Sequence, residues 1–132
     1  MNRIINPRYL IILFCLTVLA GRQASAEGMT GADLYRQYCS ICHGNSGKGD
    51  GAAADALRTK PADLTQLTHK YDGKFPELRI MNFIRGDDTL PAHGSRQMPI
   101  WGRVFLSIDS NHEVVQMRIY SLLRYVESLQ EK

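Results

Sequence analysis

The sequence is poor in cysteine, with three in 132 residues. Cys15 lies inside an apolar run near the N-terminus, so only Cys39 and Cys42 remain for the rest of the chain. A small secreted domain built on disulfides needs several cysteine pairs spread along the sequence. The scarcity excludes such a scaffold and leaves a small core, which is marginal without another means of stabilisation.

A long apolar run is also missing. The run from Tyr9 to Ala20 has 12 residues, fewer than the ~20 that a membrane-spanning helix needs. Arg3 and Arg8 supply a basic start, and Ala24-Ser25-Ala26 follows as an A-x-A cleavage pattern. We interpret residues 1–26 as a secretory signal peptide that directs the protein to the periplasm, with an uncleaved membrane anchor as the alternative.

No run of lysine or arginine is present. Removing Arg3, Arg8 and Arg22 with the signal from the 16 basic residues leaves 13, which equals the 13 acidic residues. A neutral mature chain without a basic stripe excludes nucleic acid as a partner. Removing residues 1–26 from the 132 leaves the 106 residues 27–132, a length typical of one domain.

No segment alternates with a period of two, so strands are not expected and the fold class is all-α. Four helical stretches are predicted, separated by loops rich in glycine and proline. They run from residue 30 into the cysteine pair, over 51–57, over 77–85 and over 110–129. The intervening loops cover 44–50, 59–75 and 86–109, and loops of this length in a small domain usually wrap around something.

Capping signals support three of these helices. The hydroxyl of Thr30 can cap the first helix. Pro76 is a good first-turn residue for the third, and Gly86 ends it. Ser110 with Glu113 is typical of a capping box at the start of the last helix.

The segment Cys39-Ser40-Ile41-Cys42-His43 has four interpretations. A thioredoxin-like redox pair would follow a strand, and none is expected here. A structural zinc site needs four ligands, and no second cysteine pair exists. A disulfide across two residues closes a tiny loop and would stabilise little. The C-x-x-C-H pattern is also the signature of covalent haem attachment.

Haem attachment fits the chemistry of these residues best. Two thiols on one helical turn can reach two vinyl groups on one edge of a porphyrin, and the histidine can give Nε2 to the iron. Export to an oxidising compartment is consistent with it, and a tethered cofactor would fill the core of a chain with few cysteines. We therefore predict one covalent haem c.

Five pieces of the sequence occur in a familiar order. They are Gly31 with Tyr35, then CSICHG, GKGDGAAA, MPIWG and the final LLRY. In this set the chain resembles the class I c-type cytochromes, in particular the bacterial monohaem type. The resemblance implies a cytochrome c fold, with about four short helices wrapped around one covalent haem. It also implies that Gly31 and Tyr35 pack across the last helix, which contributes Leu122 and Tyr125.

A haem iron with one histidine ligand is open to small molecules, and a second protein ligand suits it to electron transfer. We predict that Met98 is this ligand, because Pro99 biases it toward an extended backbone and the family resemblance points to the same residue. Met81 falls at the spacing of a core residue, whereas His93 would give a bis-histidine iron. The remaining methionines and histidines fit these roles less well: Met29, Met117, His69 and His112.

Two further residues are assigned from the resemblance. In the family a proline carbonyl after the motif accepts a hydrogen bond from the ligating histidine, and Pro61 is the proline in that region. Trp101 is expected to stack on the haem edge or to donate to a propionate, with plain core packing as an equal alternative. Arg96 and Arg103 are expected at the surface.

The glycines of GNSGKGDG do not form a phosphate-binding loop, because Asp50 stands where that motif requires lysine. Their expected role is conformational: they turn the chain sharply around the ring, where a Cβ would collide.

These observations predict a periplasmic electron-transfer protein, not an enzyme, with iron held by His43 and Met98. We expect a monomer that exchanges single electrons with a redox donor and an acceptor protein. Two other classes stay open: the haem subunit of a larger dehydrogenase, oxidase or reductase, which would be a membrane-associated redox complex, and a gas-binding or peroxidase-like haem protein.

Overall fold

The computed structural model describes residues 28–87 and 97–131. This part of the chain contains six α-helices, two short 3-10 helices and no strand, which confirms the all-α fold class. In chain order the elements are α2 (Gly31–Tyr38), α3 (Ser40–His43), η1 (Ala54–Ala56), η2 (Leu64–Gln66), α4 (Leu67–Lys70), α5 (Glu77–Arg85), α6 (Trp101–Ile108) and α7 (His112–Ser128). The predicted signal peptide, with Cys15, lies outside the described residues.

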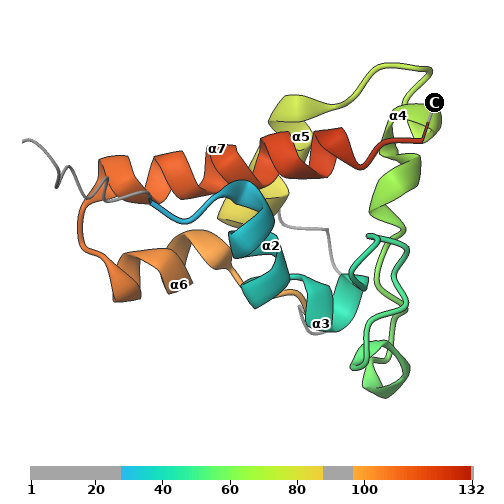
Figure 1. The fold of residues 1–132 in the computed structure, drawn as a ribbon, viewed down its shortest axis with the longest axis horizontal. Helices are drawn as coiled ribbons and strands as arrows, with labels where there is room; N and C mark the ends of the chain where they lie inside the picture. The colour runs from blue at the N-terminus through green and yellow to red at the C-terminus, as the bar shows by residue number, and fades with distance from the viewer. Residues whose placement is uncertain (1–27, 88–96, 132) are drawn as a thin grey trace, which may run out of the picture.

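The long helix α7 organises the fold (Figure 1). Helix α2 crosses it, α5 packs against it, and α6 precedes it in an antiparallel hairpin. The core lies between these four helices and also includes Leu67 of α4. Its residues are apolar side chains, one tyrosine included, that solvent barely reaches. They are Leu34, Tyr35, Leu67, Ile80, Ile84, Phe105, Val115, Ile119, Leu122, Leu123 and Val126.

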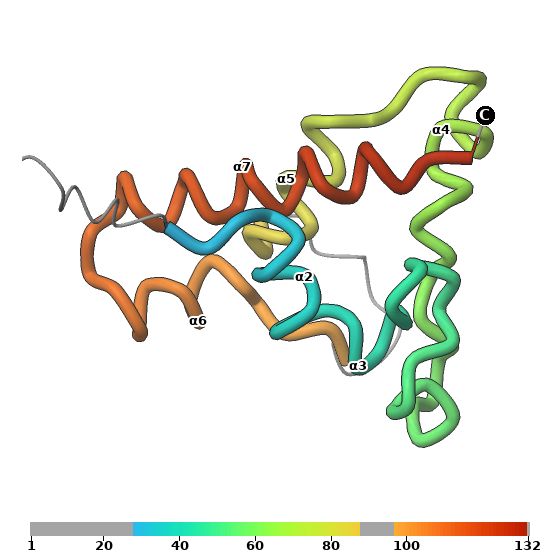
Figure 2. The backbone as a smooth tube through the Cα atoms, in the orientation of Figure 1, coloured from blue at the N-terminus to red at the C-terminus, as the bar shows by residue number. Residues whose placement is uncertain are grey.

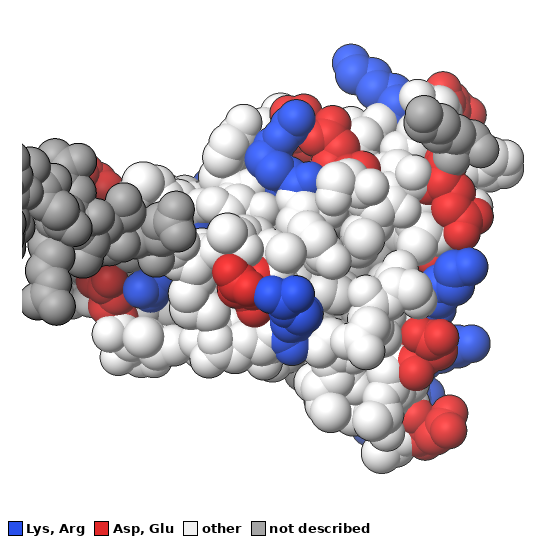
Figure 3. Space-filling view, viewed as in Figure 1, with Lys and Arg blue, Asp and Glu red and all other residues white. Residues whose placement is uncertain are grey.

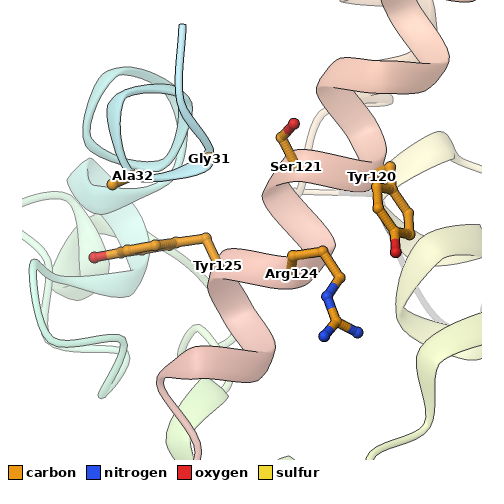
Figure 4. A pocket seen from close by; sticks show the side chains of 6 residues that line it. All are labelled: Gly31, Ala32, Tyr120, Ser121, Arg124 and Tyr125. Carbon is orange, nitrogen blue, oxygen red and sulfur yellow. The ribbon is translucent and has the colours of Figure 1, made fainter.

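The crossing of α2 and α7 depends on a glycine, as the resemblance implied. A Cβ at Gly31 would lie 2.8 Å from the carbonyl carbon of Ser121 and 3.1 Å from the Cβ of Tyr125, closer than the 3.5–4.0 Å optimum for carbon atoms. One turn further along α2, the rings of Tyr35 and Tyr125 meet with centroids 5.0 Å apart. Figure 4 shows Tyr125 projecting from α7 on the α2 side, whereas Arg124 points away from α2.

Local signals explain one end of each of three helices, α2, α5 and α7. Thr30 caps α2 in a reciprocal capping box with Asp33, as predicted for its hydroxyl. Gly86 ends α5 in the left-handed conformation with φ of 93°, which confirms both the bounds and the stop of that helix. The predicted cap of α7 was wrong by one residue: the side chain of Asn111, not Ser110, accepts from the first-turn amides.

The structure also corrects two predicted loops. The 59–75 segment contains η2 and α4, and the 86–109 segment contains α6, an eight-residue helix. The stretch 51–57 forms only a 3-10 turn over Ala54–Ala56. These short elements carry weak local signals, and tertiary contacts decide them.

Between α3 and α4 the chain leaves the helices as an arm, residues 44–63, which folds back on itself (Figure 2). The C-terminal residues hold the base of this arm. The Gln130 side chain donates to the Leu64 carbonyl (2.6 Å) and accepts from the Thr68 amide (2.8 Å). Lys48, in the first part of the arm, pairs with Glu131 at 3.4 Å.

Charges of both signs are interspersed on the face shown in Figure 3, with no large area of one sign. This distribution agrees with the neutral mature charge inferred from the sequence. Among the helices of residues 28–87 and 97–131, none has the length and apolar character needed to span a membrane.

Candidate functional site

The two cysteines and the histidine lie on a single helical turn. Cys39 ends α2 and precedes α3, and its carbonyl accepts from the amides of Cys42 (3.2 Å) and His43 (2.9 Å). Both thiols are free and half-buried. Burial, with Cys42 nearby, raises the pKa of the Cys39 thiol to about 12. A protonated thiol is a poor nucleophile for disulfide exchange, so the free redox-pair interpretation gains no support.

The His43 ring is held by a backbone carbonyl. Its Nδ1 lies 3.0 Å from the carbonyl oxygen of Ala62, and because a carbonyl can only accept, Nδ1 carries the hydrogen. Burial lowers the pKa of His43, and the Ala62 hydrogen bond partly opposes this shift. The ring is therefore favoured in the neutral form, with its Nε2 lone pair available to a metal.

The acceptor is a correction, because the sequence had pointed to Pro61. The Pro61 carbonyl is turned toward Gly49, where a Cβ would lie 3.2 Å from the Pro61 carbonyl carbon and still closer to its oxygen. The next carbonyl in the chain, that of Ala62, consequently faces His43. The family resemblance indicated the correct segment of the arm but not which of two consecutive carbonyls points at the ring.

The glycine-rich part of the arm pairs with the end of α3. The amides of Ala53, Gly51 and Gly49 donate in turn to the carbonyls of Ile41 (2.9 Å), Cys42 (3.1 Å) and His43 (2.8 Å). These are carbonyls that a helix end leaves without intrahelical partners. The backbone of the motif is therefore fixed by the segment that follows it.

This pairing requires glycine. Gly44, Gly47 and Gly49 have φ of 77°, 83° and 75°, a region that other residues rarely occupy. At Gly51 a Cβ would lie 2.6 Å from the Cys42 carbonyl carbon. The sharp turns are confirmed, and the atoms that a Cβ would meet belong to the chain itself. That the turns pass around the haem ring stays a prediction.

Tyr35 connects the core to this turn. Its buried hydroxyl donates to the Gly44 carbonyl at 2.7 Å, and burial raises the pKa of Tyr35 well above its usual value of 10. The hydroxyl therefore stays a proton donor at any physiological pH. The sequence singled out Tyr35 for packing alone and missed this hydrogen bond.

Met98 lies in the loop before α6 and is 36% exposed. The neighbouring Gln97 ties this loop to the arm, because its side-chain oxygen accepts from the Thr59 amide at 3.0 Å. Met81, which the sequence assigned to the core, is engaged elsewhere: its sulfur accepts from Arg85 at 3.3 Å. Met98 thus stays the predicted second ligand.

The other candidates are exposed or lie outside the described residues. Met29 and Met117 are 42% and 60% exposed at the surface, and His69 and His112 are exposed. Arg103 is exposed as predicted. His93 and Arg96 are not among the described residues.

Trp101 begins α6 within an aromatic cluster. Its ring lies 5.4 Å from that of Tyr38 and 5.8 Å from that of Phe105, centroid to centroid. Tyr38 immediately precedes Cys39, so Trp101 joins the α6 end of the Met98 loop to the cysteine motif. The cluster supports core packing, and contact of Trp101 with haem stays a prediction.

The donor set fits a covalently attached haem. Cys39 and Cys42 offer two free thiols on one turn, and His43 offers Nε2 while its Nδ1 is hydrogen-bonded, the usual arrangement of a ligating histidine. Within residues 28–87 and 97–131, no three His, Cys, Asp or Glu side chains form a group that could hold a metal ion, so the zinc interpretation finds no ligand set there.

One family model matches the chain. It is described as cytochrome C oxidase, cbb3-type, subunit III, and it covers residues 26–110, from before α2 to just before α7. Searches of curated proteins and of solved structures gave no match.

Proposed function

Because this chain belongs to the cbb3-type cytochrome c oxidase subunit III family, we propose that it is a periplasmic monohaem cytochrome c that carries single electrons. Membership makes it a c-type cytochrome with covalently bound haem c. The sequence contains a single C-x-x-C-H motif, which accounts for one haem. In the proposal Cys39 and Cys42 form the thioethers, and His43 and Met98 ligate the iron.

The observation that carries the proposal is the state of the His43 ring. Its Nδ1 is committed to Ala62 and its Nε2 is left to bind, on the same turn as two free thiols. The carbonyls behind the motif are paired with amides of the arm, so the backbone that carries these three side chains is held in place. Haem bound there supplies a one-electron couple at its iron.

Three further residues position the proposed haem-binding side chains: Ala62, Tyr35 and Pro99. Ala62 keeps His43 in one tautomer, which raises its basicity toward the iron. Tyr35 anchors the turn after His43 to the core. Pro99 biases the backbone of Met98 toward an extended conformation that lets the side chain leave its loop. The signal peptide of residues 1–26 would deliver the chain to the periplasm, where the thioethers are made.

A second candidate function follows from the family description. The chain would then be the haem subunit of a larger oxidase rather than a free carrier. Both candidates use the same site, and they differ in whether the protein is isolated alone or in a stable complex with a larger redox protein.

The test starts from the exported protein made in cells with a haem-ligation apparatus. Its intact mass should exceed that of the polypeptide by one haem, and Cys39→Ala or Cys42→Ala should lower the yield of attached haem. A mass equal to the bare polypeptide would refute the proposal at its first step.

Ligation by Met98 is tested by spectroscopy. The ferric protein should show a far-red charge-transfer band that Met98→Ala removes and Met117→Ala, an exposed methionine on α7, preserves. The ferrous protein should not bind carbon monoxide, whereas Met98→Ala should. Ready carbon monoxide binding by the unmutated protein would instead favour the gas-binding class.

A further inference from the structure

One side-chain hydrogen bond joins two segments that the sequence holds far apart. The Thr59 amide donates to the Oε1 of Gln97 at 3.0 Å, across 38 positions of the chain. Gln97 immediately precedes Met98, and its side chain is half-buried. The bond therefore fixes the residue beside the predicted iron ligand.

Thr59 belongs to the same arm that orients the histidine. Three residues after Thr59, the carbonyl of Ala62 accepts from His43. Between them Pro61 has a fixed φ, and its carbonyl packs against Gly49, leaving no room for a Cβ there. Gln97 is thus attached to a short, constrained stretch whose other end holds the His43 ring.

The opposite end of the Met98 loop is fixed by α6. Trp101 packs against Tyr38, with ring centroids 5.4 Å apart. Gly102 lies so close to the end of α5 that an added Cβ would be 2.6 Å from the Arg85 carbonyl oxygen. Between the Gln97 bond and the first residue of α6, only residues 98–100 remain, and Met98 is the first of them.

We propose that Gln97 is a positioning residue for Met98: by accepting from the Thr59 amide, it holds the Met98 loop against the arm that orients His43. This inference rests on the proposed ligation by Met98. Without the bond, residues 97–100 would lose this attachment to the arm while the contacts of α6 remained, and Met98 would leave the iron more often. A neutral hydrogen bond of this kind shifts such an equilibrium by about two- to tenfold.

The experiment measures how easily a neutral ligand displaces Met98 from the ferric holoprotein. Imidazole is titrated into the wild type and into Gln97→Leu, Gln97→Glu and Gln66→Leu, and loss of the far-red band is followed. Gln66 is the matched control, because its Nε2 donates to Glu131 Oε2 at 2.6 Å and so joins η2 to the C-terminal residues. All four proteins are also unfolded with urea to compare their global stability.

The apparent affinity for imidazole should rise about two- to tenfold in Gln97→Leu. It should stay at the wild-type value in Gln66→Leu and return toward that value in Gln97→Glu, whose carboxylate can still accept from Thr59. Equal affinities in Gln97→Leu and wild type overturn the inference, as does an equal increase in Gln66→Leu.

The two proposals fail in different ways. A wild-type protein without the far-red band, or a band that survives Met98→Ala, refutes ligation by Met98 and the role of Gln97 with it. A band that Met98→Ala removes, together with an unaltered imidazole affinity in Gln97→Leu, refutes the role of Gln97 alone.

Discussion

The crossing of α2 and α7 should not tolerate a side chain at Gly31. Replacing Gly31 with alanine places a Cβ 2.8 Å from the Ser121 carbonyl carbon and closer still to the oxygen. The optimum for two carbon atoms is 3.5–4.0 Å, so the helices must separate by roughly 1 Å. The obstacle is backbone of α7, which cannot move aside as a flexible side chain would.

The loss of stability in Gly31→Ala follows from overpacking. Inserting a methyl group into a close-packed contact destabilises by about 1–3 kcal/mol. Alanine regains part of this, because it favours a helix over glycine by up to about 1 kcal/mol in a helix interior, and Gly31 is the first residue of α2. We expect a net loss of about 1–2 kcal/mol, on the order of 10 °C in Tm for a domain of this size.

Two other glycines provide matched controls. Neither Gly28 nor Gly73 has an atom within 4 Å of an added Cβ. Of these two, Gly73 has a positive φ, of 81°. Thermal unfolding of the holoprotein, followed by far-UV circular dichroism, should leave Gly28→Ala at the wild-type Tm. Gly73→Ala should lose about 1–2 kcal/mol from backbone strain alone.

The discriminating readout is the cysteine motif. Separation of α2 from α7 should disturb the Tyr35–Tyr125 contact and, through the Tyr35 hydroxyl, the turn at Gly44. Gly31→Ala should therefore alter the haem absorption spectrum, whereas Gly73→Ala should not. If Gly31→Ala unfolds at the same temperature as Gly28→Ala, the inference that α2 and α7 meet too closely for a side chain at residue 31 is wrong.

Two more substitutions test the motif and the helix that leads to it. Tyr35→Phe removes the donor of a buried 2.7 Å hydrogen bond and leaves the Gly44 carbonyl with the longer, 3.3 Å bond from the Gly47 amide, so urea unfolding should show a loss of about 0.5–1.5 kcal/mol; an unchanged midpoint would contradict this. Hydrogen bonds from Thr30 lower the pKa of Asp33 below its usual 3.8, so its stabilisation is complete above that value and is lost as pH falls through the lower, folded-state pKa. Between about pH 5 and pH 2, stability should therefore fall more steeply in the wild type than in Asp33→Asn, and identical pH profiles would argue against the capping box.

Some of the fold could be predicted because the signals are local. Pro76, the apolar pattern after it and Gly86 bound α5 correctly, since a helix start and a left-handed stop are properties of a few neighbouring residues. Helix α6 gave no such signal. It has eight residues, a glycine at its second position and no side-chain cap, and the aromatic contacts of Trp101 and Phe105 with Tyr38 come from elsewhere in the chain.

The sequence does not predict the contacts of the site that depend on the folded backbone. The motif predicts Cys39, Cys42 and His43 as the attachment site, because attachment chemistry itself imposes their order. Between Pro61 and Ala62, however, the choice depends on which carbonyl faces His43. It is decided by the packing of the Pro61 carbonyl against Gly49, a contact between residues 12 positions apart.

The two sides of the proposed haem site, that of His43 and that of Met98, are held by different kinds of hydrogen bond. This difference explains why the sequence predicts the contacts of one side better than those of the other. On the histidine side, the amides of residues 49, 51 and 53 pair with the carbonyls of residues 43, 42 and 41. This register joins segments close in the chain and needs glycine at fixed positions, so it leaves a readable pattern. On the methionine side, a hydrogen bond between the Thr59 amide and the Gln97 side chain spans 38 residues. Neither threonine nor glutamine is a residue type whose presence in the sequence predicts such a bond. Substitutions in the glycine-rich arm should therefore affect folding and haem attachment together, whereas those at Gln97 should affect the hold on Met98 alone.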